Sequence, residues 1–228
     1  MRVASSLLQQ GLVLQSVSAG CPYTQYSSTY TVDFCDPDAI LCVVDSACEP
    51  LHSYTNKDIV LDDTNTKTLK LTYSAEHLAQ LPYASPSLQF INAVHTVGDI
   101  SNSTVALLNI VNTPGLDLSG AIFPPQLTHL DLRNCELQTL PANVAYNELS
   151  EFYGLGNRWT QIANIDLRGT NDFNFNDCPS LTALSNVSFS SRSLTKFYAT
   201  ASTFTTFLID PSTYDVLNGV STFSVKGI

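Results

Sequence analysis

The segment from Leu127 to Pro141 constrains the fold more than any other part of the chain. It reads LTHLDLRNCELQTLP and places leucines at its first, fourth, sixth, eleventh and fourteenth positions. Apolar positions four and six alternate with polar positions five and seven, which is the pattern of a short strand with one buried face. The segment therefore predicts a strand that is followed by a turn.

The same pattern recurs from residue 66 to the end of the chain. Eight segments align on it in steps of 19 to 24 residues, with first positions at Thr66, Ser85, Val105, Leu127, Leu149, Thr170, Leu194 and Leu217. The fourth positions are all apolar: Leu69, Leu88, Leu108, Leu130, Phe152, Phe173, Phe197 and Val220. The sixth positions are mostly apolar and fail only at Gly154 and Thr222. Repeats of this length predict a solenoid whose units bury their apolar faces against one another.

One stretch allows two registers. Residues 162–170, IANIDLRGT, fit the strand pattern as well as residues 170–178 do. A second candidate strand, with Leu184, Val187 and Phe189, follows 22 residues later. We favour the register through residues 170–178, because the matching segments at Leu149 and Leu194 stand 45 residues apart, about two repeats.

This pattern, with Cys135 at the ninth position, resembles a leucine-rich repeat, closely over 127–141 and more loosely over the rest of 66–228. The resemblance implies an α/β-type or mostly β solenoid, a curved array of about seven to eight irregular repeats with a parallel concave sheet, which we assign to residues 61–228. The last repeat contains only twelve residues and ends at Ile228. We therefore expect a fragment of a longer chain, with any membrane span or kinase in the missing part.

The N-terminal region has the features of a secreted protein. Residues 1–20 combine Arg2, a short apolar stretch and the small residues Val17, Ser18 and Ala19, which predicts a signal peptide. Four cysteines follow within 28 residues and predict two disulfides in an N-terminal cap over residues 21–60, with zinc as the weaker alternative: Cys21, Cys35, Cys42 and Cys48. Three connectivities remain possible.

Two other residue sets fit an extracellular solenoid. Cys135 and Cys178 occupy the ninth position of repeats two apart, about 10 Å from each other, so we expect buried free thiols rather than a disulfide. Asn102 and Asn186 begin glycosylation sequons that fall late in their repeats, away from the predicted sheet.

Catalytic motifs are missing from the sequence. The four histidines lie in separate segments, and neither an HExxH motif nor a GxSxG motif occurs. We therefore predict neither an enzyme nor a cofactor or metal site. The formal charge of -10 disfavours nucleic acid as a partner.

The concave sheet is the predicted binding surface, because side chains at positions three, five and seven do not hold the core. Tyrosine and arginine often anchor interfaces, and here they stand among hydrogen-bonding groups. We predict non-covalent binding of a protein, peptide or glycan ligand by His129, Asp131, Arg133, Glu151, Tyr153, Asn174, Asn176, Lys196 and Tyr198. With the signal and the cap, this resembles the ectodomain of a leucine-rich-repeat receptor-like protein or receptor-like kinase. A secreted hydrolase and a structural or adhesion wall protein are the competing hypotheses.

Overall fold

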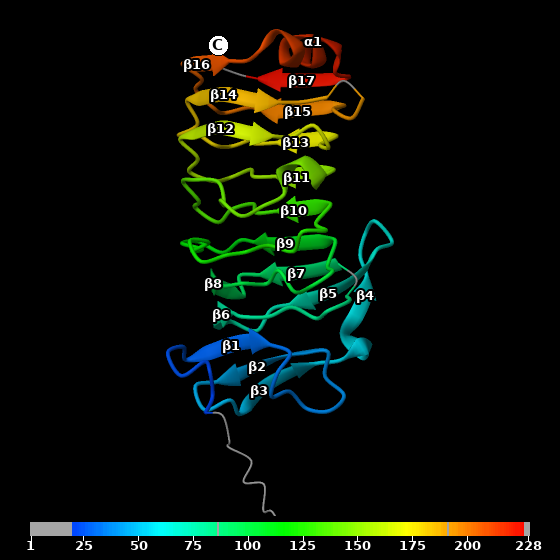
Figure 1. Ribbon diagram of the computed structural model, residues 1–228, viewed down its shortest axis with the longest axis vertical. Helices are drawn as coiled ribbons and strands as arrows, with labels where there is room; N and C mark the ends of the chain where they lie inside the picture. Colours follow the sequence, from blue (N-terminus) through cyan, green and yellow to red (C-terminus); the bar gives the residue numbers. More distant parts are fainter. Residues whose placement is uncertain (1–19, 86, 191, 226–228) are drawn as a thin grey trace, which may run out of the picture.

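The protein is a parallel β-solenoid of about seven turns whose coils stack in a column (Figure 1). The computed structural model describes residues 20–85, 87–190 and 192–225, so most of the predicted signal peptide, and the end of the chain, lie outside the described residues. Strands dominate the secondary structure. The helical elements are η1 (Asn56–Asp58), η2 (Tyr146–Glu148) and α1 (Pro211–Gly219).

One wall of the column is a nine-stranded sheet. Its strands are β4 (Ile59–Leu61), β5 (Lys67–Leu71), β7 (Ser87–Ile91), β9 (Leu107–Val111), β10 (His129–Asp131), β11 (Glu151–Tyr153), β13 (Asp172–Asn174), β15 (Lys196–Ala199) and β17 (Thr222–Val225). All neighbours pair in parallel except β4, which forms an antiparallel hairpin with β5. We call the outward side of this sheet the front face.

The fourth-position residues form the continuous row that the sequence predicted for the first seven repeats. They pair in register from Leu69 through Leu130 to Phe197, and each is fully buried. The apparent failure at Gly154 has a steric reason, because an added Cβ would lie 2.6 Å from the ring of Phe175 in the next coil. The glycine therefore makes room for an aromatic side chain in the core.

The turn that ends each front strand explains the polar residues at the eighth position. Six of these residues adopt a left-handed conformation with φ between 50° and 69°: Asn92, Asn112, Asn134, Gly156, Asp177 and Ala201. Asparagine, aspartate and glycine tolerate this conformation best. The turn directs the next side chain inward, and the ninth-position residues of the same six repeats are all buried.

The opposite wall contains a second set of strands and resolves the two competing registers. Its strands are β6 (Ala75–Leu78), β8 (Val94–Val97), β12 (Gln161–Asp166), β14 (Ala183–Ser188) and β16 (Thr206–Leu208). β13 lies in the front sheet, which confirms the favoured register. The rejected segments, around Ile162 and Leu184, are also strands, and they pair with each other in this back wall, where Ile162 lies opposite Leu184. Both patterns were real because the coils of β11 and β13 each have a second strand, β12 and β14, in the back wall.

The predicted register is wrong in the last repeat. Phe223, not Val220, pairs with Phe197 in the fourth position, and Val225 takes the sixth position opposite Ala199. The helix α1 accounts for the shift of three residues. It occupies residues 211–219, so Leu217 lies in the helix rather than at the start of a strand.

The N-terminal region forms a small disulfide-linked sheet at one end of the column. Strands β1 (Ser28–Thr31), β2 (Leu41–Asp45) and β3 (Pro50–Tyr54) are antiparallel, and β1 also pairs in parallel with β6 of the back wall. The four cysteines form the disulfides Cys21–Cys48 and Cys35–Cys42. The prediction of two disulfides is confirmed, and their connectivity is nested.

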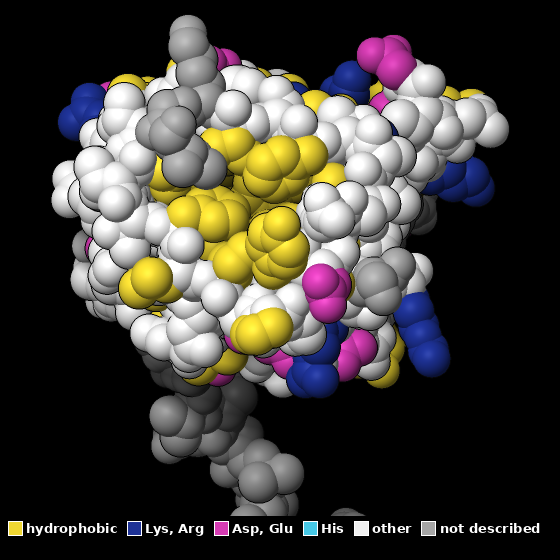
Figure 2. All heavy atoms as spheres, turned by 90° about the horizontal axis from the view of Figure 1, so that it is seen from above, with side chains coloured by type: hydrophobic (Ala, Val, Ile, Leu, Met, Phe, Trp, Pro, Cys, Tyr) yellow, Lys and Arg dark blue, Asp and Glu magenta, His cyan; other side chains and the backbone are white. Residues whose placement is uncertain are grey.

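The other end of the column is apolar. Figure 2 looks onto this end and shows hydrophobic side chains gathered at its centre. Leu208 of β16, Tyr214 of α1 and Phe223 of β17 are each between 47% and 64% exposed. Among the described residues, no helix has the length and hydrophobicity that a membrane crossing requires.

Candidate functional site

Two adjoining hollows lie on the front face. The lower hollow has a volume of about 500 Å³ and extends from the hairpin loop 62–66 to Glu151 and Tyr153. The upper hollow, about 450 Å³, extends from Arg133 to Tyr198. Arg133 and Tyr153 line both hollows, so the two form one surface over β10, β11, β13 and β15. All nine predicted ligand-binding residues line one hollow or both.

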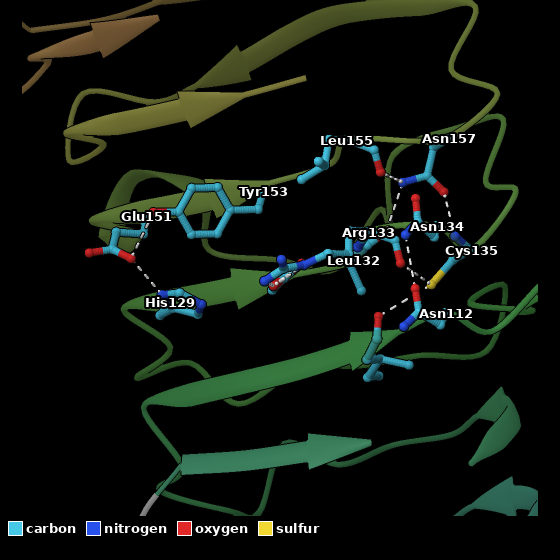
Figure 3. Close-up of polar contacts among 12 residues, drawn as sticks. Asn112, His129, Leu132, Arg133, Asn134, Cys135, Glu151, Tyr153, Leu155 and Asn157 are labelled. Atoms are coloured by element: carbon cyan, nitrogen blue, oxygen red, sulfur yellow. Dashed lines mark hydrogen bonds and ion pairs between the residues drawn. The ribbon is translucent and has the colours of Figure 1, made fainter. Parts of the chain in front are cut away.

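Three side chains from β10 and β11 form a hydrogen-bonded group in the lower hollow (Figure 3). His129 Nδ1 lies 2.8 Å from Glu151 Oε2, and the Tyr153 hydroxyl donates to the same oxygen over 3.1 Å. The rings of His129 and Tyr153 meet edge to face, with 5.3 Å between their centroids. Burial, with the nearby carboxylates of Asp172 and Glu151, raises the pKa of Tyr153. The hydroxyl therefore stays protonated and acts as a donor.

Asp131 differs from the expected row of exposed side chains. Its carboxylate is 1% exposed, whereas the side chain of Arg133 that pairs with it is 45% exposed. Arg133 donates through Nε over 2.8 Å and through its backbone N–H over 3.1 Å, and the Asp131 carboxylate raises the pKa of the guanidinium. Because arginine covers it, Asp131 positions Arg133 and is not itself free to meet a ligand.

The upper hollow is lined by polar residues of β13 and β15 and the turns that follow them. Lys196 Nζ lies 3.3 Å from Asp172 Oδ2. Asn174 Oδ1 accepts from the backbone N–H of Asn176 over 3.2 Å, and Asn176 Oδ1 accepts from the N–H and the hydroxyl of Thr200 over 2.9 and 2.7 Å. Each asparagine is therefore held by its carbonyl oxygen.

A buried asparagine supports the surface from below. Asn157 Oδ1 accepts from the backbone N–H of Cys135 over 3.0 Å, and its Nδ2 donates to the carbonyl of Leu132 over 2.7 Å (Figure 3). The same two atoms also bond the N–H of Leu137 and the carbonyl of Gly154, both over 3.0 Å. These bonds join the turns after β10 and β11. Asn157 thus fixes the ends of the two strands that carry Arg133 and Tyr153.

The ninth-position cysteines are free and buried, which confirms the prediction. Burial raises the pKa of both Cys135 and Cys178 to about 11. Both thiols are therefore protonated at neutral pH, and they have no nucleophilic character there.

Sequence analysis missed one part of this surface, the loop of the β4–β5 hairpin. Asp62, Asp63, Thr64 and Thr66 of this loop line the lower hollow. Asp62 accepts from the backbone N–H groups of Thr64 and Thr66, and hydrogen bonds from Thr64 and Thr66 are the main reason that its pKa is lowered to about 2. The run Asp62-Asp63-Thr64-Asn65 is a turn signal, but only the folded hairpin brings it beside β7 and β9.

The two sequons lie away from the front face. Asn102 is exposed in a turn, and Asn186 is exposed on β14, where its Nδ2 donates to Asn164 Oδ1 over 2.9 Å. Glycans at either residue would leave the front face open.

Within the described part of the chain, no group of three or more His, Cys, Asp or Glu side chains is arranged to hold a metal ion. The chain matches no family model, no curated protein and no solved structure among those compared.

Proposed function

We propose that this protein is an extracellular recognition module of the leucine-rich-repeat type that binds its ligand non-covalently on the front face. The single observation that carries the proposal is the continuity of the surface, since residues from four consecutive strands line two hollows that share Arg133 and Tyr153. The tyrosine, arginine and asparagine side chains on the front face are not needed to bury the apolar core. Their presence supports a surface kept for contact.

The setting of the module is inferred from its cap. Two disulfides indicate folding in an oxidising environment. A signal peptide over residues 1–20, glycans at Asn102 and Asn186, and a receptor-like parent protein are the further elements of the proposal. A solenoid with a capped end and a polar sheet face is an architecture well suited to holding a ligand across several strands.

A binding screen tests the proposal. The full chain, secreted from eukaryotic cells, would be offered an immobilised set of oligosaccharides and a displayed library of short peptides. We expect retention of one class of probe, and we expect Tyr198→Ala to weaken it about thirtyfold, the effect of losing an anchor worth about 2 kcal/mol. Tyr198 is the best choice because it lines the upper hollow and because its hydroxyl, unlike that of Tyr153, has no partner among the described residues.

Tyr83→Ala is the matched control. Tyr83 is 75% exposed and lines neither hollow, so its truncation should leave retention and melting temperature unchanged. Retention of no probe, or equal retention by the Tyr198→Ala chain, would contradict the proposal.

Hydrolysis of a glycosidic bond is a second candidate, favoured by the placement of two carboxylates. Glu151 and Asp172 lie directly opposite each other on adjacent strands, whose backbones are about 4.8 Å apart. Retaining glycosidases hold their two carboxyl groups about 5 Å apart, and neighbouring strands can present such a pair. Each carboxylate already contacts a basic group, His129 or Lys196. Product release from oligosaccharides that is abolished by Glu151→Gln would favour this candidate over simple binding.

A further inference from the structure

The charged groups of the upper hollow are paired within the protein. Arg133 is held by Asp131, and Lys196 lies 3.3 Å from Asp172. A charged ligand would have to break these pairs or bind without a counter-charge. The hollow therefore suits a neutral ligand.

The remaining polar groups are mainly hydrogen-bond donors with fixed directions. Asn174 and Asn176 are held by their carbonyl oxygens, and among the described residues neither Nδ2 has a partner. The hydroxyl of Tyr198 likewise has no partner there. The two amide donors are held in place before any ligand arrives, so little of their side-chain freedom is lost on binding.

Two aromatic rings flank these donors at a defined spacing. Tyr153 and Tyr198 occupy the same row on β11 and β15, and Asn174 stands between them on β13. Two strand spacings separate the tyrosines, about 10 Å. An extended chain of β-linked pyranose rings advances by nearly one strand spacing per ring, so alternate rings would reach the two tyrosines.

We infer that the front-face ligand is a neutral, β-linked oligosaccharide that crosses β11, β13 and β15 with one sugar ring over each strand. This inference rests on the proposed function and specifies the ligand of the same site. The flat apolar faces of the sugars stack on Tyr153 and Tyr198. The hydroxyls of the central ring accept from the amides of Asn174 and Asn176.

A peptide fits this surface less well. β11, β13 and β15 are each paired on both sides, so no strand edge is open here for a peptide to extend the sheet. Of the described residues, Leu155 is the single aliphatic one that lines the upper hollow, so an apolar side chain of a peptide would have little to pack against.

The length dependence of binding tests the inference. Calorimetry would use the full chain with cello-oligosaccharides and laminari-oligosaccharides, from disaccharide to hexasaccharide. We expect affinity to rise roughly thirtyfold from disaccharide to trisaccharide in at least one series, because the third ring adds the second tyrosine, an anchor worth about 2 kcal/mol. In Tyr198→Ala this rise should disappear, whereas Tyr83→Ala should keep it.

Three results would overturn the inference. The protein could bind neither series but retain short peptides in a manner that depends on Tyr198. That result would leave the proposed function standing and show that its ligand is not an oligosaccharide. Tighter binding of oligogalacturonate than of the neutral series would show that the ligand is an anion. Retention of no probe at all would overturn both proposals.

Discussion

Replacement of Asn157 by alanine tests the structural basis of the front face. The residue is 1% exposed, and its side chain makes five hydrogen bonds to backbone groups. Four of them, to Cys135, Leu137, Leu132 and Gly154, are 3.0 Å or shorter. A hydrogen bond contributes about 1 kcal/mol net, and a buried group left without a partner costs about that much or more. Four such bonds predict that Asn157→Ala lowers the free energy of unfolding by about 4 kcal/mol.

Denaturant unfolding of the full chain measures this loss, and hydrogen exchange locates it. The backbone amides of Cys135 and Leu137 should lose protection first, because their acceptor is gone. Asn143→Ala is the control, since Asn143 is exposed and its side chain makes a single hydrogen bond within the described part of the chain, to the carbonyl of Ala121 over 3.2 Å. A loss below about 1 kcal/mol for Asn157→Ala, or unchanged protection of the two amides, would show that these hydrogen bonds do not hold the two turns together.

Three further predictions concern the cap and the buried titratable groups. The Cys21–Cys48 disulfide closes a longer loop than Cys35–Cys42, with 27 against 7 residues of separation. In a denaturant titration, replacing the first pair with serine should lower the free energy of unfolding by about 3.6 kcal/mol, and replacing the second pair by about 2.5 kcal/mol. The reverse order would contradict the dependence on loop length. Cys135 and Cys178, with pKa values of about 11, should resist iodoacetamide at neutral pH in the folded chain and react after unfolding, so modification of the native protein would contradict their burial. Burial lowers the pKa of His77, whose ring stacks on Tyr26 with 3.9 Å between centroids, below its usual 6.5. The unfolded chain therefore takes up the proton first, and thermal melts should show stability falling as the pH drops below about 6.5, less so in His77→Gln; an equal fall in both chains would assign the effect elsewhere.

The sequence predicted the features that repeat. The alternation at positions four and six placed seven front strands correctly, because each coil must bury the same two side chains. The ninth position predicted buried thiols for the same reason. Features that occur once were harder to predict, as the shift at Phe223 shows. Asp210 and Pro211 are ordinary helix-start signals, but a pattern search for strands passes over them.

The candidate site was predictable as a row of residues and not as a surface. Strand periodicity placed Tyr153, Asn174 and Tyr198 on one face. The burial of Asp131 beneath Arg133 depends on how one long side chain folds over its neighbour, which periodicity does not encode. The contribution of the β4–β5 hairpin depends on a contact between segments far apart in the sequence. The disulfide pairing was equally beyond the sequence, since the spacing allowed three arrangements.

A glycan placed on the front face tests most directly whether that face is the binding surface. Asn176→Thr makes residues 174–176 match the N-glycosylation pattern, and Asn174 stands at the centre of the upper hollow. Mass analysis would select the fraction glycosylated at Asn174, and its retention on the probe identified in the screen would be compared with that of Asn176→Ala, which loses the same side chain without gaining a sugar. We predict that the glycosylated chain melts as Asn176→Ala does, because both variants lose the oxygen that accepts from Thr200. The glycosylated chain should no longer bind, while Asn176→Ala should bind more weakly but measurably. A glycosylated chain that binds as tightly as the parent would contradict the assignment of the binding surface to the front face.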